Sequence, residues 1–215
     1  MNNEILRHER IYRGPETMQR LQRARVTLCG AGAVGSHLAV NLARQGVGSL
    51  VVIDRDRVEQ HNPGTQIFAE AEIGLRKADC LRNRIFDEVG LEVDAIAREI
   101  TTKNIDKHLR GARLVVDSFD NHPARAAVTA YCRRTAVPCL HVGLAADYAE
   151  VIWNEGYRVP GDQGIDVCNY AMARNVILLA VAVASECVIR FLTSGERASY
   201  TITLEDFAVR RHVVV

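Results

Sequence analysis

The sequence lacks the features that would place it in a specialised class. Its 215 residues are 48% hydrophobic, 25% charged and only 6% aromatic, which excludes disordered, collagen-like and disulfide-scaffold proteins. The formal net charge is +1, so bulk attraction to nucleic acid or to an anionic membrane is not expected. The chain is long enough to bury a core without covalent staples. One domain is therefore the simplest expectation.

Long apolar runs and paired cysteines are also missing. The longest apolar run, residues 176–184, is nine residues, whereas a membrane-spanning helix needs about 20. None of the six cysteines forms a Cys-x-x-Cys pair, which argues against a structural zinc site. No apolar segment follows the first basic residues, so no secretory signal is expected. We therefore expect a cytoplasmic protein with reduced thiols.

What the sequence does contain is a regular alternation of short apolar runs and amphipathic helical patterns. The early apolar runs lie at residues 25–29, 50–53 and 114–116. This alternation is typical of a doubly wound, mostly parallel sheet. The later runs are closer together, which predicts an antiparallel C-terminal part. Residues 1–24 read as a polar helical arm broken at Gly14, and residues 73–89 and 169–192 predict two of the helices.

A glycine-rich loop follows the first apolar run directly. Gly30, Gly32 and Gly35 fit the pattern G-x-G-x-x-G between a strand and a helix. The first glycine permits the turn, the second lets a phosphate approach the backbone, and the third lets helix and strand pack closely. Asp54 ends the next strand, where a ribose-binding acid belongs in such folds. The loop predicts nucleotide binding but does not identify the nucleotide, and glycines that serve only helix packing are the alternative.

Polar residues further along the chain narrow the chemistry. Loops after the strands of a doubly wound sheet converge on one crevice. The polar residues at such positions are Asp54, Asn62, Gln66, Lys77 and Asp120. A lysine and an acid beside phosphates suit charge neutralisation and Mg²⁺ binding, and a nicotinamide site does not need them. We therefore predict that these side chains surround a triphosphate.

These motifs, taken in order, resemble the ThiF/MoeB adenylyltransferases, the group that includes ubiquitin-activating enzymes. The resemblance covers about residues 10–145 and, more loosely, the long helix after 169. The matching stretches are residues 10–13, 30–35, 45–50, 52–58, 62, 66, 73–77 and 117–121. The resemblance implies a Rossmann-like fold and a single nucleotide-binding domain over residues 1–215.

The resemblance also implies a reaction and a set of roles. The C-terminal glycine carboxylate of a ubiquitin-like or sulfur-carrier protein would attack the α-phosphate of ATP, releasing pyrophosphate and leaving an acyl-adenylate. The glycine loop would cradle ATP, Asp54 would hold the ribose, Lys77 would face the phosphates and Asp120 would bind Mg²⁺. The further nucleotide-site residues are Asp56, Asn62, Gln66 and Asn121. Arg13 would reach into the site of a second copy, which makes a homodimer the expected state.

The chain departs from the family pattern at one phosphate-contacting position. Family members usually carry an arginine immediately before Gln66, and this chain has Thr65 there. Threonine cannot donate a bidentate charged contact to a phosphate. Either adenylation is slower, or Arg55, Arg57 or Arg13 substitutes, or the chain is a weakly active or inactive nucleotide-binding subunit of an activating complex.

Cys168 precedes the long helix, near where some family members place a cysteine for thioester transfer. A thiol close to a helix N-terminus has its thiolate favoured, which supports a nucleophile. Asp162 and Asp166 lie nearby and disfavour the thiolate. A thioester-forming nucleophile and a packed thiol are both open at this point.

Several of these residues also have purely structural interpretations. Lys77 would then be an exposed helix lysine, Asp120 a helix cap and Arg13 a surface arginine. His141, at a strand end, is expected to be a hydrogen-bonded structural residue. An NAD-dependent oxidoreductase is the less favoured reading, because it needs a catalytic acid–base group and residues after 145 show no such motif.

Overall fold

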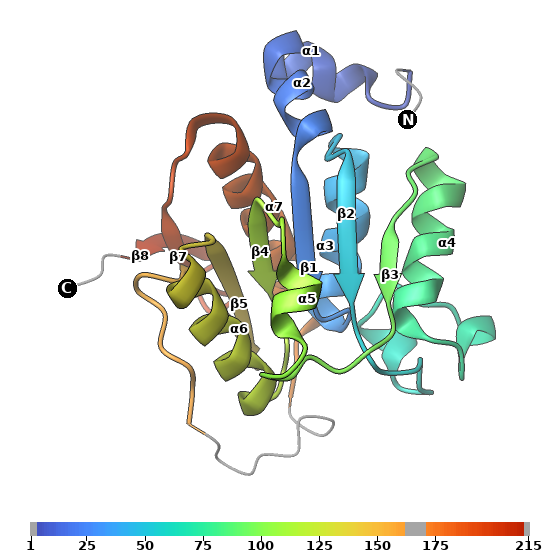
Figure 1. Cartoon of the computed structure of the whole chain (residues 1–215), viewed down its shortest axis with the longest axis vertical. Helices are drawn as coiled ribbons and strands as arrows, with labels where there is room; N and C mark the ends of the chain where they lie inside the picture. Colours follow the sequence, from blue (N-terminus) through green and yellow to red (C-terminus); the bar gives the residue numbers. More distant parts are fainter. Residues whose placement is uncertain (1–3, 162–170, 213–215) are drawn as a thin grey trace.

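The computed structural model describes residues 4–161 and 171–212, which form a single eight-stranded sheet with helices packed on it (Figure 1). The strand order is β3-β2-β1-β4-β5-β6-β7-β8. The strands are β1 (Arg25–Cys29), β2 (Ser49–Ile53), β3 (Asp94–Ile96), β4 (Leu114–Asp117), β5 (Cys139–Ala145), β6 (Tyr148–Trp153), β7 (Ser199–Thr203) and β8 (Ala208–His212). Neighbours from β3 to β5 pair in parallel, and those from β5 to β8 pair antiparallel. The predicted fold class is confirmed.

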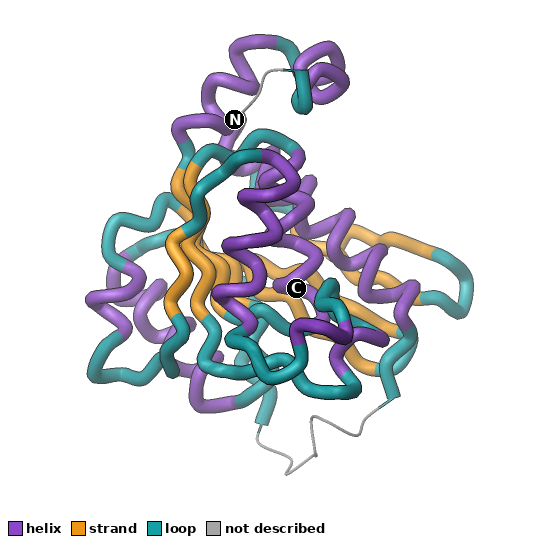
Figure 2. The backbone as a smooth tube through the Cα atoms, turned by 90° about the vertical axis from the view of Figure 1, so that its right-hand side faces the viewer, coloured by secondary structure: helices purple, strands orange, loops and turns teal. Residues whose placement is uncertain are grey.

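Helices cover both faces of the sheet (Figure 2). They are α1 (Arg7–Arg13), α2 (Pro15–Arg23), α3 (Ala33–Arg44), α4 (Lys77–Val89), α5 (Ile105–Leu109), α6 (His122–Thr135) and α7 (Arg174–Ser194), with short 3₁₀ turns at Asn62–Gly64 and Glu70–Glu72. The larger apolar core lies between the sheet and α3, α4 and α7. A smaller core lies on the opposite face, under α5 and α6.

The helix predicted over residues 169–192 begins later and ends later than expected. The structure describes this region from residue 171 onward, and α7 starts at Arg174. Met172 forms an isolated parallel bridge with Ala146, and the Ala173 N–H donates to the Ala146 carbonyl (2.9 Å). These contacts hold the residues before Arg174 extended. The helix ends at Ser194 and is capped by Gly195, which has a φ of +79°.

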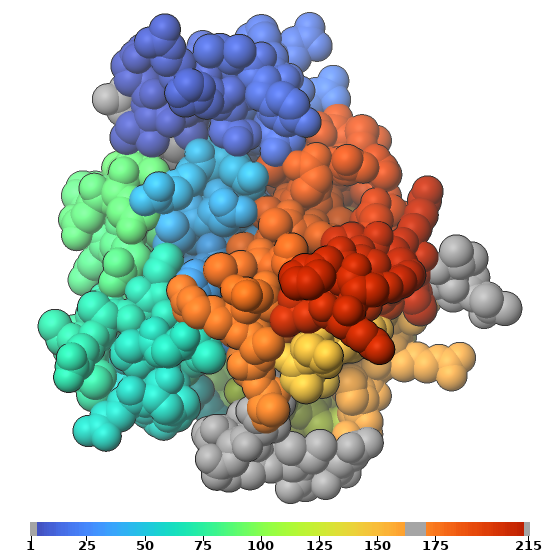
Figure 3. Space-filling model, turned by 180° about the vertical axis from the view of Figure 1, so that it is seen from behind, coloured from blue at the N-terminus to red at the C-terminus, as the bar shows by residue number. Residues whose placement is uncertain are grey.

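Burial explains why α7 is so apolar. By length and composition the helix could cross a membrane, yet 61% of its most apolar window is buried inside the protein. It packs beside α3 on the back of the sheet, where Figure 3 shows the two helices side by side in orange and light blue. An apolar helix that covers a sheet face and a second helix reads as a core helix.

The segment before α4 is not helical, although the sequence pattern predicted a helix over residues 73–89. Gly74 has a φ of +89°, its N–H donates to the Val58 carbonyl (2.8 Å), and Val58 in turn donates to Leu75 (2.9 Å). The chain from 55 to 76 therefore folds back on itself. As a result, Lys77 is the first residue of α4.

The sheet changes winding direction between β1 and β4. From β1 the chain crosses through α3 to β2 on one side, and from β4 it crosses through α6 to β5 on the other. In such sheets ligands bind at the carboxyl ends of the strands that flank the change. The connections that meet there follow β1, β2 and β4, and they carry the candidate residues.

Candidate nucleotide-binding site

The three glycines after β1 have different surroundings. Gly30 has a φ of +100°, and its N–H donates to the Ile53 carbonyl (2.9 Å). A Cβ at Gly35 would lie 2.0 Å from the Gly30 carbonyl oxygen, so α3 could not pack against the loop with any side chain there. A Cβ at Gly32 would meet nothing within 4 Å. Gly30 and Gly35 thus build the loop, and Gly32 leaves open space at the amino end of α3.

This difference predicts opposite behaviour of two alanine variants. We expect Gly35→Ala to lower the free energy of unfolding by about 2 kcal/mol, because it overpacks a backbone contact. We expect Gly32→Ala to leave stability within about 0.5 kcal/mol of the parent but to weaken nucleotide binding, because its methyl group enters the open space. Urea unfolding and calorimetric titration with Mg²⁺-ATP measure the two effects. Equal loss of stability in both variants would contradict the assignment.

Asp54 lies at the carboxyl end of β2 and is bonded to the glycine loop. Its carboxylate accepts hydrogen bonds from the N–H groups of Ala31 (2.7 Å) and Asp56 (2.7 Å). The residue is 6% exposed. Burial raises the pKa of Asp54, although the Lys77 charge and the two hydrogen bonds act in the opposite direction. The Lys77 charge is the largest of the effects that favour the ionised form of Asp54.

Lys77 is not the exposed helix lysine of the alternative interpretation. It is 7% exposed, and its N–H donates to the Asp56 carbonyl (3.0 Å). The side chain is close enough to Asp54 to act on its pKa. Asp56 itself is half exposed and pairs with Arg55 (3.5 Å). Of the two acids, only Asp54 is therefore built into the loop.

The segment after Asp54 lies across the amino end of α3. The Ile67 N–H donates to Ser36 Oγ (3.3 Å). Asn62 is buried, and its Oδ1 accepts a hydrogen bond from the Glu59 N–H (2.8 Å), so this side chain holds the turn. Gln66 Oε1 is buried with no hydrogen-bond partner. An unpaired buried oxygen is costly, and a bound ligand with a donor group would satisfy it.

The connection after β4 carries Asp120 and Asn121. Ser118 Oγ donates to the carbonyls of Cys29 (3.1 Å) and Gly30 (3.3 Å), which ties this connection to the glycine loop. Asn121 Oδ1 accepts a hydrogen bond from the Ala124 N–H (3.0 Å) and caps α6. Asp120 is therefore not the cap, and its exposed carboxylate contacts only the Asn121 amide (3.4 Å) among the described residues.

The donor set fits a Mg²⁺ ion that arrives with its phosphates. Within the described ranges, no three His, Cys, Asp or Glu side chains are grouped so as to hold a metal. Mg²⁺ is usually bound by one or two carboxylates together with substrate phosphates and water. The exposed Asp120 beside the glycine loop satisfies that requirement, whereas a resident all-protein metal centre would need more ligands.

The sequence interpretation missed a buried polar network beneath this connection. The Asp117 carboxylate accepts a hydrogen bond from the Phe119 N–H (3.1 Å) and lies 2.9 Å from His141 Nδ1. His141 Nε2 lies 3.0 Å from Asn154 Oδ1, and its ring stacks on Tyr157 with centroids 3.7 Å apart. His141 is thus a hydrogen-bonded structural residue, as expected. No sequence signal connected it with Asp117, because their pairing depends on the β4–β5 register.

Arg125 closes the network from α6. Its guanidinium donates to the Tyr157 hydroxyl (2.8 Å) and to the Val142 carbonyl (2.9 Å), and it lies 3.9 Å from the Asp117 carboxylate. Burial alone lowers the pKa of Arg125, but Asp117 and Tyr157 outweigh it and raise that pKa. The network therefore links β4, β5, α6 and the segment after β6 under the connection that carries Asp120.

Two predicted site residues do not join the cluster. Helix α1, which ends at Arg13, lies at the opposite end of the sheet (Figure 1). The Arg13 side chain is 10% exposed, and it pairs with Glu9 (2.5 Å) and Glu186 (2.9 Å). It is therefore not a freely exposed surface arginine. Cys168 lies outside the described residues. The other five cysteines are buried and free.

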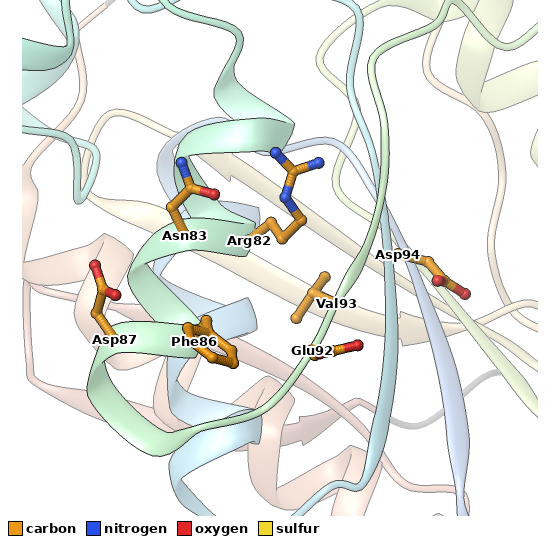
Figure 4. Close-up of a pocket in the computed structure, with 7 residues that line it drawn as sticks. All are labelled: Arg82, Asn83, Phe86, Asp87, Glu92, Val93 and Asp94. Atoms are coloured by element: carbon orange, nitrogen blue, oxygen red, sulfur yellow. The ribbon is translucent and has the colours of Figure 1, made fainter.

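A surface cavity of about 530 Å³ lies elsewhere on the molecule (Figure 4). It is bounded by α4 and the start of β3, and its lining residues are Arg82, Asn83, Phe86, Asp87, Glu92, Val93 and Asp94. The cavity is at the amino end of β3, whereas the glycine loop is at the carboxyl ends of the strands. It is not part of the candidate site.

Comparison with known proteins assigns most of the chain to one protein family. The model of the ThiF family matches residues 5–188. The SAMP-activating enzyme E1 of Haloferax volcanii is 32% identical over 130 residues, covering 60% of this chain and 48% of the relative. The tRNA threonylcarbamoyladenosine dehydratase of Escherichia coli is 34% identical over 138 residues, covering 62% and 51% respectively. The chain thus spans about half the length of the curated relatives it matches.

A solved structure confirms the fold. The crystal structure of E. coli MccB with ATP aligns over all of this chain and 72% of MccB, with a TM-score of 0.81 and 24% sequence identity. At this identity the likeness establishes the arrangement of strands and helices.

Proposed function

We propose a function for this chain, which belongs to the ThiF family: it is an ATP-dependent adenylyltransferase. Its substrate would be the C-terminal glycine carboxylate of a ubiquitin-like or sulfur-carrier protein. The observation that carries the proposal is the meeting of three connections at one end of the sheet. They bring together the glycine loop, the Asp54–Lys77 pair and the exposed Asp120.

The geometry supports chemistry by positioning and electrostatics. The carboxylate oxygen of the substrate would attack the α-phosphorus, and the bond from that phosphorus to the bridging oxygen would break. Pyrophosphate would leave with the electron pair. The N–H groups at the amino end of α3 would hold the phosphates, and Lys77 would offset their charge. Mg²⁺, held by Asp120, would add charge neutralisation when bound.

The proposal includes a homodimer, in which Arg13 of one copy acts in the nucleotide site of the other. Helix α1, which ends at Arg13, lies at the end of the sheet opposite the glycine loop of its own chain (Figure 1), so Arg13 would act in the site of a partner. Ile11 and Tyr12 on α1 are 73% and 79% exposed, and this apolar surface suits contact with a second copy. Release of Arg13 would break its pairs with Glu9 and Glu186. Sedimentation of the parent and of an Ile11→Glu variant tests the homodimer.

Thermal unfolding in the presence of nucleotide directly tests whether the chain binds ATP. A ligand at a hundred times its dissociation constant adds about 2.7 kcal/mol to stability. We expect Mg²⁺-ATP to produce such a shift and NAD to produce none. Stabilisation by NAD alone would contradict the proposal and favour an oxidoreductase.

Exchange of labelled pyrophosphate into ATP then tests the transfer. We expect exchange that depends on a carrier protein ending in glycine, and none when the terminal glycine is removed. Exchange that needs tRNA bearing a carboxylate instead would place the chain with the dehydratase relative. ATP binding without exchange for any acceptor would favour the inactive-subunit alternative.

A further inference from the structure

Arg174, the first residue of α7, contacts the segment from residue 55 to 76, which lies across the amino end of α3. Its Nη1 donates to the Gly64 carbonyl (3.1 Å). The neighbouring Thr65 carbonyl lies 3.2 Å from a ring nitrogen of His37, on α3. Burial is the main cause that lowers the pKa of His37, and the positive charge of Arg174 lowers it further. The guanidinium is therefore close to the amino end of α3. Figure 3 shows the orange start of α7 bordering the teal 55–76 segment.

The other arginines near this loop contact parts of it that are farther along the chain from Thr65, or contact residues outside it. Arg55 pairs with Glu99 (2.6 Å), Arg57 donates to the Gly74 carbonyl (2.6 Å), and Arg76 donates to the Arg55 carbonyl (2.5 Å). Within the described residues no carboxylate forms an ion pair with Arg174. It is exposed, and one contact to a carbonyl leaves most of its five N–H donors unused.

The position of Arg174 is electrostatically unfavourable in the absence of an anion. It is the first residue of a 21-residue helix, and the first turn holds no acidic residue. A cation at a helix N-terminus is repelled by the helix dipole. A second helix, α3, directs its own amino end toward the same region. An anion between them would be attracted by both helices and by the guanidinium.

Thr65 contributes no charge to this region, although it stands next to Gly64 in the loop. The cation that contacts the loop beside Thr65 comes instead from a helix more than 100 residues away in the sequence.

We propose that Arg174 binds the phosphate chain of the nucleotide and makes the site selective for a triphosphate over a monophosphate. The inference rests on the proposed function, since it assigns a residue to the same site. Arg174 would take the place of a charged residue at Thr65, because it contacts Gly64, the residue directly before that position. Arg57 contacts Gly74 instead, and Arg55 pairs with Glu99.

Calorimetric titration with Mg²⁺-ATP and with AMP tests the inference. We expect Arg174→Ala to weaken ATP binding at least tenfold, since it removes charge-assisted hydrogen bonds, and to change AMP binding less than twofold. Arg174→Lys is expected to recover part of the ATP affinity. The double variant Arg174→Ala with Thr65→Arg is expected to recover more, because it returns a guanidinium to the adjacent loop position. Arg82→Ala is the matched control, because Arg82 is an exposed arginine at the cavity outside the candidate site, and this variant should bind ATP as the parent does.

The outcomes separate this inference from the proposed function. A parent protein that binds neither nucleotide overturns both. A parent that binds ATP, together with an Arg174→Ala variant that binds it equally well, overturns the role of Arg174 alone. Equal loss of ATP and AMP affinity with a lowered unfolding midpoint would show that Arg174 only stabilises the fold through its contact with Gly64. That result would also overturn the proposed role of Arg174 in phosphate binding. Selective loss of ATP affinity, rescued at Thr65, supports it.

Discussion

An Asp120→Ala variant is expected to lose adenylation activity by about 10²–10³-fold, the effect of removing one electrostatic group from a transition state. Asp120 follows β4 beside the glycine loop, and its carboxylate is exposed. Stability should stay within about 0.5 kcal/mol of the parent, because the cap of α6 is supplied by Asn121 instead. Pyrophosphate exchange at saturating carrier protein measures the loss.

The matched control for this prediction is Asp87→Ala on α4. Asp87 is also an exposed aspartate, but it lines the cavity at the far end of β3. We expect its exchange rate to equal that of the parent. If Asp120→Ala kept full activity at every Mg²⁺ concentration, Asp120 would have no part in the reaction. If excess Mg²⁺ restored activity to Asp120→Ala, that would strengthen the assignment of a metal ligand.

An Asp117→Ala variant is expected to lower the free energy of unfolding by about 3 kcal/mol. Removing one partner of a buried charged pair typically costs 3–5 kcal/mol, because the other partner stays buried without compensation. The charged partner of Asp117 is Arg125, which lies 3.9 Å from the fully buried carboxylate with 11% of its own side chain exposed. His141 Nδ1 also lies 2.9 Å from that carboxylate and would lose this contact. Urea unfolding followed by far-UV circular dichroism measures the change.

Asp106→Ala provides the comparison for a surface pair. Asp106 pairs with Arg134 at 2.7 Å, but both side chains are more than half exposed, and such pairs contribute about 0–1 kcal/mol. A loss below about 1 kcal/mol in Asp117→Ala would show that the network adds little to stability. Asp117→Ala should also reduce exchange activity, since the Phe119 N–H that holds the Asp120 connection loses its acceptor.

The sequence predicted the parts of the candidate site that depend on residues close together in the chain. Gly30, Gly32 and Gly35 stand within six residues of one another, and Asp54 ends the next apolar run, so strand–turn–helix logic was enough to place them. The mostly parallel sheet followed from the same alternation. Lys77 was predicted to lie near the start of a helix over residues 73–89, and in the structure it is the first residue of that helix.

The sequence did not predict contacts that depend on tertiary pairing. His141 meets Asp117 only because β5 pairs with β4 in one register, and Tyr157 stacks on it from beyond β6. Arg174 reaches Gly64 because the bridge between Met172 and Ala146 sets where α7 begins. The predicted helix began at residue 169, which put Arg174 inside it, so its place at the helix start was not foreseen. The roles of Arg13 and Cys168 stay predictions.

The order of strands also bears on how the molecule folds. Val26 pairs with Leu114 at the centre of the sheet, whereas β5 to β8 are mostly joined to their sequence neighbours by short turns or, for β7, by α7. Pairing β1 with β4 requires closure of a long loop. The entropic cost of that closure is incurred before the contacts that compensate it can form. We expect this closure to limit the refolding rate. Since Ser118 contacts the Gly30 carbonyl only after closure, the nucleotide site is completed at that late step. Nucleotide should therefore slow unfolding without speeding refolding.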